Sequence, residues 1–319
     1  MARKLLLLIF LIGLLVPGVC LAQSNPTGGI SVTPSIVHID LSVDPAEYTL
    51  TYTNNFNSDV VLKLSAKDFT ALEDSYQLEF LNQNQDQNYK YGLSSWISFE
   101  NPYLDLSPHE TSTVKVFIDK QKITRGGHYA SILAEVTQPQ TTKDIGVQAV
   151  ISSLLFVRAS TGQEIEEGKI FSFDPLRDGI DFPDSFLLRF ENSGNVHVIP
   201  YGLLQIYDPL GNLVGKGIVN EDSLDALPES IRNYTIKVKS PTSLLLPGEY
   251  TAKLYLHFGK TGRKLQTSIK FFSQGSFNLL QIGVGIILII IAIFIYRKRG
   301  VRPKERTKLR DDNLPDARS

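Results

Sequence analysis

The sequence predicts an all-β protein of two tandem antiparallel β-sandwiches, of the immunoglobulin-like type, followed by one C-terminal transmembrane α-helix. Three observations support this fold class. Short runs of alternating polar and apolar residues recur along the chain, turn-forming residues separate them, and one long uncharged apolar segment lies near the C-terminus. The only cysteine is Cys20, so we expect both sandwiches to fold on apolar cores without disulfides, which favours a bacterial surface.

The first 22 residues have the order of a secretory signal peptide. Arg3 and Lys4 precede the apolar run Leu5–Val16, and Cys20–Ala22 puts small residues at the positions that a signal peptidase reads. The alternative is an uncleaved anchor, but this apolar run is well short of the roughly 20 residues that a bilayer-spanning helix needs. We therefore predict a signal peptide over residues 1–22 and an exported mature chain.

The second apolar segment, Phe277–Tyr296, contains no charged residue. About 20 helical residues cross a hydrocarbon core of ~30 Å, so a transmembrane helix is predicted over residues 277–296. Basic residues stay on the cytoplasmic side, which makes residues 297–319 a basic cytoplasmic tail and leaves a large N-terminal ectodomain outside. The predicted location is the cell membrane, with a single pass and membrane lipid as a partner. The residues expected to anchor it are Phe277, Tyr296, Arg297, Lys298 and Arg299.

Charge is divided unevenly along the chain, whose formal net charge is −1. Residues 297–319 hold nine basic and four acidic residues, and the signal holds two basic ones, which leaves 21 basic and 29 acidic residues between them. An acidic exported part is a poor ligand for polyanions. We expect no nucleic acid among the partners.

The part between the two termini has the pattern of β-strands. Alternation of polar and apolar residues indicates half-buried strands, and turn-forming clusters such as Asn192–Asn195 and Asp208–Asn212 separate them. No stretch here has a helical period. The alternating runs are Tyr48–Thr53, Val60–Ser65, Thr113–Ile118, Phe186–Glu191, Tyr234–Lys239 and Thr251–Phe258.

Similar short motifs recur in both halves of this region. Leu104–Pro108 has the same form as Leu224–Pro228, and each is followed by an alternating strand and then a glycine turn before a tyrosine. These tyrosines, Tyr129 and Tyr250, resemble the tyrosine corner of Greek-key sandwiches, in which the hydroxyl bonds to nearby backbone. We predict sandwich domains over residues 30–160 and 165–273, with a linker at 162–168. Tyr129, Tyr250 and a core Trp96 are expected to be structural.

No arrangement of residues predicts catalysis. The five histidines lack metal-ligand spacing, no nucleophile or phosphate-loop motif occurs, and the mature chain has no cysteine. The acidic cluster Asp174, Asp178, Asp181 and Asp184 has two interpretations, a calcium loop or a solvated loop, and Leu176 occupies a position where calcium would need an oxygen ligand. We expect no enzyme activity, no metal and no cofactor.

Two exposed features are candidates for recognition. The amide-rich stretch Asn82–Tyr91 suits a sugar or peptide ligand, because amides match hydroxyls and aromatic rings pack on apolar faces. Its tentative ligand residues are Asn84, Asp86, Tyr89 and Tyr91, and the alternative is a flexible polar loop. The other candidate is an open edge strand that takes an extended peptide by strand addition.

Three short motifs of the first predicted domain resemble a known family. The chain is similar to the WxL-interacting surface proteins of Gram-positive bacteria in its order of segments and in the motifs Thr33–Pro34, Tyr52–Asn54 and Arg125–Ala130. Lys67–Asp74 departs from the pattern, since that family has an Asn-Gly turn there. The sandwiches are also similar to the pilus-chaperone type, although the basic cleft residues of those chaperones are not identifiable. The resemblance implies that the first domain binds peptidoglycan and the second a protein or host ligand.

Two functions are therefore predicted. The first is a membrane-anchored cell-surface binding or adhesion protein, whose sandwiches bind cell-wall peptidoglycan or another exported surface protein. The alternative is a non-enzymatic assembly or export accessory that holds another exported protein by strand addition, as a chaperone does. An open hydrophobic edge strand would favour the alternative.

Overall fold

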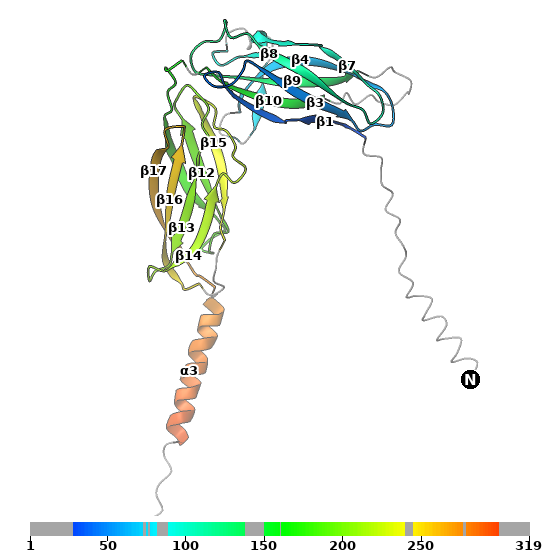
Figure 1. Cartoon of the computed structure of the whole chain (residues 1–319). Coiled ribbons are helices and arrows are strands. Elements are labelled where there is room, and N and C mark those ends of the chain that lie inside the picture. The colour runs from blue at the N-terminus through cyan, green and yellow to red at the C-terminus, as the bar shows by residue number, and fades with distance from the viewer. Residues whose placement is uncertain are drawn as a thin grey trace, which may run out of the picture. The chain divides into compact units, whose positions relative to one another are not determined.

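The computed structural model describes residues 28–72, 75, 77–81, 89–137, 150–159, 161–239, 245–276 and 279–299. The predicted signal peptide lies outside these ranges, as do residues 300–319 of the predicted tail. The chain divides into two compact units (Figure 1). Unit 1 comprises Met1–Leu72, Gln77–Ile165 and Gly194–His197, and unit 2 comprises Glu73–Tyr76, Glu166–Ser193 and Val198–Ser319.

Unit 1 is built from two β-sheets that enclose an apolar core. The four-stranded sheet has the order β1 (Ile30–Thr33), β3 (Glu47–Asn54), β8 (Thr111–Ile118), β6 (Ile97–Phe99). The larger sheet has the order β2 (Ile36–Asp40), β10 (Val150–Arg158), β9 (Gly127–Thr137), β4 (Val60–Ala71), β5 (Leu78–Phe80), and β7 (Tyr103–Leu106) also pairs with β4. A short 3₁₀ helix, Ser94–Trp96, precedes β6.

Unit 2 also has two sheets around one core. One has the order β11 (Gly168–Leu176), β12 (Ser185–Asn192), β15 (Ser230–Lys237). The other has the order β14 (Leu213–Val219), β13 (Tyr201–Tyr207), β16 (Gly248–Phe258), β17 (Arg263–Ser273). The described units are therefore β-sheet structures, which confirms the all-β part of the predicted fold class.

The strands form where the sequence alternates, because each has one face in the core and one in solvent. In β12 every second side chain is buried, and Phe186, Leu188 and Phe190 have no exposed surface. Full burial of one such side chain contributes about 1.5–3 kcal/mol. In unit 2 the aromatic rings pack directly on one another, as in the stacked pair Tyr250 and Phe271, whose centroids lie 5.6 Å apart.

The core of unit 1 contains two tyrosine hydroxyls without a hydrogen-bond partner. Tyr48 and Tyr52 lie four residues apart on β3, and neither hydroxyl oxygen is accessible or bonded. Burial raises the pKa of both side chains, and the neighbouring Tyr52 raises that of Tyr48 further. A buried polar group without a partner costs free energy, so these hydroxyls are a local weakness of the core.

Each unit has a buried asparagine at the end of one of its first strands. Asn54 ends β3, and its side-chain amide donates to the carbonyls of Ser58, Leu106 and Ser107 at 2.9, 3.2 and 2.9 Å. Asn192 ends β12 and donates to the carbonyl of Ala226 at 2.8 Å. Leu106 and Ala226 are the third residues of the two similar motifs. The internal repeat in the sequence therefore corresponds to the same hydrogen bond in each unit.

The predicted membrane location is wrong, and the correction concerns helix α3 (Leu279–Arg299). In the part of the chain that the structure describes, no helix has both the length and the apolar character that a bilayer crossing needs. The expected lipid partner loses its basis with this finding.

Replacement of Tyr52 by Phe removes a buried hydroxyl that has no partner. We expect the free energy of unfolding of unit 1 to stay unchanged or to rise by up to about 1 kcal/mol, because only a desolvation cost is lost. Tyr250→Phe is the matched control in unit 2. It deletes a hydroxyl that donates to the carbonyl of Leu246 and should lower stability by about 1–2 kcal/mol. Urea unfolding measures both, and a loss at Tyr52 as large as at Tyr250 would contradict the assignment.

Replacement of Asn54 by Ala leaves three carbonyls of unit 1 without their donor. We expect a loss of about 2–3 kcal/mol in the free energy of unfolding, measured by urea denaturation. Asn55→Ala is the control, because this neighbour is exposed and its amide lies 3.4 Å from the Ser31 hydroxyl, so its loss should cost less than about 0.5 kcal/mol. Equal effects of the two substitutions would show that the buried amide has no special role.

Candidate functional site

The N-terminal strand of unit 1 is split between the two sheets. β1 pairs antiparallel with β3, whereas β2 pairs parallel with β10 in the other sheet. Pro34 lies at the crossing, where a residue without a backbone N–H interrupts the ladder at no cost. Two hydrogen bonds fix the crossing to β10: the Leu154 N–H donates to the Ser35 carbonyl at 2.9 Å, and the Ser153 hydroxyl donates to the Pro34 carbonyl at 2.8 Å.

This crossing leaves half of the β10 edge without a paired strand among the described residues. β2 pairs with Leu154–Arg158, and no other described strand pairs with residues 150–153 on that side. The Leu154 N–H points to β2, so by alternation the N–H and C=O groups of Val150 and Ser152 point the same way. The result is an open edge with the sequence Val-Ile-Ser-Ser, which we call the β10 edge and which runs for about 13 Å.

The β10 edge borders the apolar core of unit 1. Ile30 and Val32 on β1 and Ile151 on β10 are only partly buried and pack against the core cluster. Val150 has half of its surface exposed, at 51%. An extended segment placed beside β10 would therefore make main-chain hydrogen bonds on one side and bury alternate apolar side chains against this rim.

Other sheet edges carry features that discourage strand pairing. β11 contains Pro175 and a bulge between Ile170 and Ser172, and β17 carries Arg263, Lys264 and Lys270. The edge strands β5 and β6 are three residues long. Compared with these edges, the β10 edge lacks charge, proline and bulge. The sequence had suggested an open edge strand without saying which one.

Next to this edge, an aromatic row crosses the outer face of the larger sheet. Phe156 on β10 is paired in register with His38 on β2 and Tyr129 on β9, and its ring lies 4.9 and 5.7 Å from theirs. Phe69 on β4 continues the row at 6.1 Å from Tyr129. Phe69, Tyr129 and Phe156 are buried. The row holds β2 against β10 along the half of the edge that is covered.

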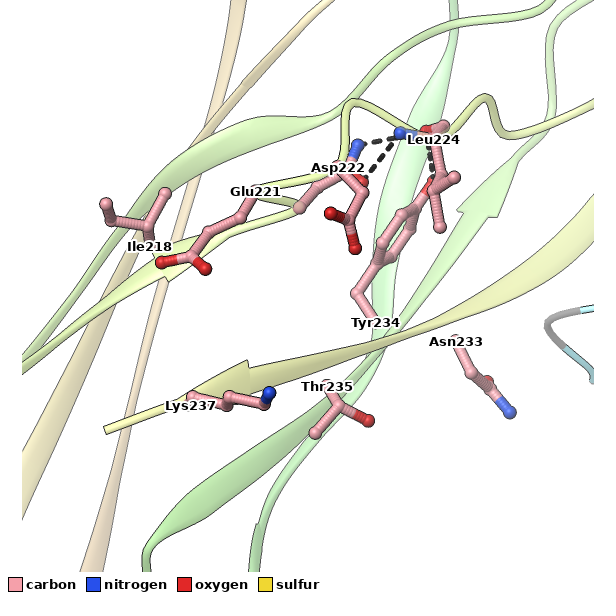
Figure 2. A pocket seen from close by; sticks show the side chains of 9 residues that line it. Ile218, Glu221, Asp222, Leu224, Asn233, Tyr234, Thr235 and Lys237 are labelled. Carbon is pink, nitrogen blue, oxygen red and sulfur yellow. Dashed lines mark hydrogen bonds between the residues drawn. The ribbon is translucent and has the colours of Figure 1, made fainter. Parts of the chain in front are cut away.

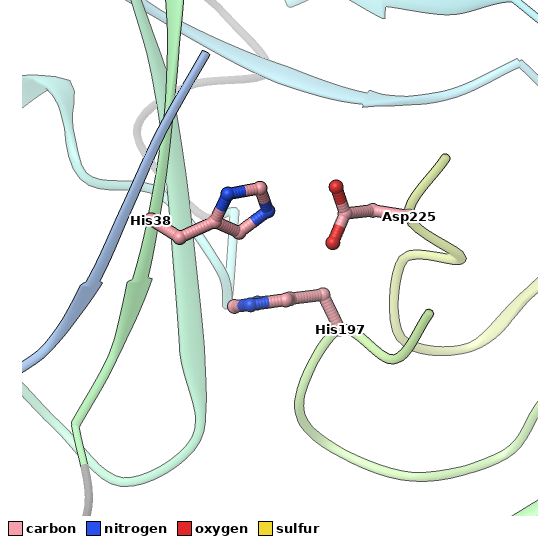
Figure 3. A group of neighbouring side chains, drawn as sticks. All are labelled: His38, His197 and Asp225. Atoms are coloured by element: carbon pink, nitrogen blue, oxygen red, sulfur yellow. The ribbon is translucent and has the colours of Figure 1, made fainter. Parts of the chain in front are cut away.

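The loop Gly194–His197, which belongs to unit 1, covers this row. The His197 ring lies 5.5 Å from Phe156 and 5.6 Å from both Tyr129 and His38, and Figure 3 shows the two histidine rings side by side and tilted against each other. The His197 backbone N–H donates to the Tyr129 hydroxyl at 2.8 Å. The third side chain in Figure 3, Asp225, belongs to unit 2, where it is buried. Sequence reasoning had treated the histidines as isolated and missed this row.

The residues predicted to be structural are placed as follows. Tyr129 and Tyr250 have no exposed surface. The Tyr250 hydroxyl donates to the carbonyl of Leu246, four residues upstream, whereas the Tyr129 hydroxyl accepts from His197, 68 residues away. Trp96 is partly buried and its ring lies 4.8 Å from that of His128.

The predicted ligand loop is only partly described. Asn84 and Asp86 lie outside the described residues. Tyr91 is 4% exposed, and its ring packs against Tyr129 at 6.3 Å and Tyr89 at 6.0 Å. Because Tyr91 is buried, it does not present a ring face to a ligand.

The predicted anchor residues stand at the end of α3. Phe277 lies outside the described residues, and Arg299 is the last residue of the helix. Tyr296 is 82% exposed, and Arg297 and Lys298 are also exposed.

Comparison with known proteins gives neither a family model nor a curated protein that matches. Similar solved structures include a chain of the chaperone–tip adhesin complex of CFA/I fimbriae, 8% identical with a TM-score of 0.39, covering 77% of this chain and 99% of that one. The E. coli chaperone DraB is 13% identical with a TM-score of 0.37, covering 77% and 98%. The Pseudomonas aeruginosa CupB2 chaperone is 12% identical with a TM-score of 0.36, covering 76% and 100%.

Because each of these TM-scores is below 0.5, the likenesses assign neither a family nor a function to this chain. The resemblance to WxL-interacting surface proteins stays a prediction.

Strand β9 of unit 1 also carries a buried histidine, His128. His128 on β9 has no exposed surface, its Nδ1 lies 3.1 Å from the Gly92 carbonyl, and its Nε2 lies 3.0 Å from the Thr124 carbonyl and 3.2 Å from the Thr124 hydroxyl. A neutral ring carries one N–H, so it donates to only one of these two carbonyls. Burial lowers the pKa of His128, although the Thr124 and Gly92 carbonyls and the nearby Asp68 oppose the shift.

Stability of unit 1 should therefore fall on acidification. A histidine whose folded pKa is below its unfolded value of about 6.5 stabilises the fold fully above that value and loses this contribution as pH falls towards the folded pKa. We expect the free energy of unfolding to drop below pH ~6.5 by at most about 1.4 kcal/mol per pH unit from this residue. Urea unfolding at several pH values measures it. His128→Gln should flatten this slope, and an NMR titration that places the His128 pKa above 6.5 would contradict the account.

Proposed function

We propose that this chain is a non-enzymatic assembly or export accessory that holds an extended segment of another exported protein along the β10 edge. The observation that carries the proposal is the uncovered, uncharged half of β10 beside an apolar rim. Strand addition suits this geometry, because main-chain hydrogen bonds supply affinity and alternate side chains supply specificity. The proposed partner segment has apolar residues at every second position.

Binding through the amide-rich loop is the weaker alternative. It required exposed tyrosine rings, and Tyr91 is buried. The membrane-anchored form of the surface-adhesion function falls with the correction to α3. Capture of a partner strand along the β10 edge is therefore better supported than binding through the amide-rich loop.

A lysine placed on the β10 edge should block capture. In Val150→Lys a charge stands beside the site where the partner strand would pair, and edge lysines are a device that natural sheets use against pairing. The full chain, expressed in the cells that make it, would carry a photo-cross-linking benzoylphenylalanine at Ser152. We expect a cross-link to another exported protein, and a drop of about tenfold in its yield with Val150→Lys, which corresponds to about 1.4 kcal/mol of lost pairing.

The matched control is Val43→Lys, the same change at a turn residue that is 79% exposed. It should leave the cross-link unchanged. If Val150→Lys and Val43→Lys give the same yield, or if a cross-linker at Val43 captures the same protein as one at Ser152, the proposal is wrong.

A further inference from the structure

The outer face of the four-stranded sheet of unit 2 carries more positive than negative charge. Alternate residues of β13, β14, β16 and β17 point outwards, because those between them are buried or partly buried in the core. The charged residues at the outward positions of these strands are Lys216, Lys253, Lys264, Lys270 and Glu249. Glu249 pairs with Lys270 at 2.7 Å, so the positive charge of this face resides on Lys216, Lys253 and Lys264.

An apolar strip crosses the same face. Ile218 on β14 is paired in register with Leu203 on β13, and Leu203 with Tyr255 on β16. Tyr201, two residues before Leu203, is paired with His257, and the two rings are stacked with their centroids 5.5 Å apart. Tyr201 is 52% exposed and Tyr255 is 38% exposed. Large apolar side chains that lie exposed side by side mark a site of interaction.

Polar side chains border this strip on the side of β17. Lys264 and Gln266 are paired in register with His257 and Tyr255, so both lie directly beside the strip. Lys253 lies two residues before Tyr255 and points to the same side of the sheet. Lys253 and Lys264 are therefore about 13 Å apart along the strand direction, with an aromatic ring and an amide between them.

Negative charge lies on the opposite side of the face. A pocket borders the edge of β14, and Figure 2 shows Glu221 and Asp222 in its lining together with Ile218. Glu221 forms an exposed ion pair of 3.9 Å with Lys239. These carboxylates disfavour an anion beside β14, whereas the lysines favour one beside β16 and β17. Screening over about 8 Å at physiological salt makes the nearby lysines, and not the acidic net charge of the exported part, decide what binds here.

The lysine on β16 keeps its donors available to a ligand. The Lys253 ammonium lies 4.9 Å from the centroid of the Tyr207 ring, a cation–π contact on an exposed side chain. Such a contact uses the charge of the ammonium group over the ring and leaves N–H groups that can donate to a carboxylate.

We propose that this face binds an acidic oligosaccharide, a short chain of sugars that carry carboxylates. The apolar C–H faces of the sugars would pack against the exposed rings of Tyr201 and Tyr255. Their hydroxyls would bond to the Gln266 amide, and their carboxylates would pair with Lys253 and Lys264. A peptide suits the face less well, because β13 and β16 are paired on both sides and offer no main-chain partner.

The sheet face lies in unit 2 and the β10 edge in unit 1, so this test does not depend on the proposed function. The probe is tetragalacturonate, titrated into the isotope-labelled full chain and followed by amide NMR shifts. We expect saturable shifts at Tyr255, His257 and Gln266. The fully methyl-esterified probe keeps the sugar rings and loses the charges, so it should bind about fivefold more weakly, the size of two exposed ion pairs.

Charge reversal on the face gives the decisive comparison. Lys264→Glu should weaken binding of tetragalacturonate by about tenfold, while Lys237→Glu, the same change on the other sheet of unit 2, should not. Tyr255→Ala should weaken it by about fivefold through the lost ring contact.

Several outcomes would overturn the proposal. They are equal binding of the charged and the esterified sugar, equal effects of the two lysine substitutions, or no shift up to the solubility limit of tetragalacturonate. An acetylated tetraglutamate peptide that binds as tightly as tetragalacturonate and shifts the same amides would also overturn it, because the face would then select charge without sugar.

Discussion

The crossing of the N-terminal chain between the two sheets of unit 1 is the constraint on which the rest of the account depends. Because β1 belongs to one sheet and β2 to the other, the chain covers only Leu154–Arg158 of β10. Pro34 stands at the crossing, and the Ser35 and Pro34 carbonyls bind Leu154 and Ser153 beside it. The covered half is stabilised by the aromatic row of His38, Phe156, Tyr129 and Phe69, and the other half is left open.

The sequence predicted the strands well because their alternation is local. The runs at 48–53, 113–118 and 186–191 lie within β3, β8 and β12, and the repeated motifs lead to the same buried bond from Asn54 and from Asn192. Long-range features were beyond local patterns. Nothing near His197 shows that its loop packs on Phe156 and Tyr129, and nothing near Ser152 shows that β2 stops pairing at Leu154. The apolar run near the C-terminus predicted helix α3, but the membrane crossing predicted for it was wrong.

The site on the β10 edge follows from how sheet edges are protected against pairing in a sandwich. Where an edge carries proline, a bulge or lysines, as in β11 and β17, pairing with another chain is discouraged. The β10 edge has none of these. Recognition there would use backbone groups, so the side chains set specificity rather than affinity.

Residue-resolved amide hydrogen exchange of the full chain tests the central claim most directly. The account predicts an alternating pattern along β10. Val150 and Ser152, which face the open edge, should exchange quickly, whereas Ile151 and Ser153 are protected by β9 and Leu154 by its bond to Ser35. Protection of Val150 and Ser152 equal to that of their neighbours would show that the edge is covered and would contradict the account.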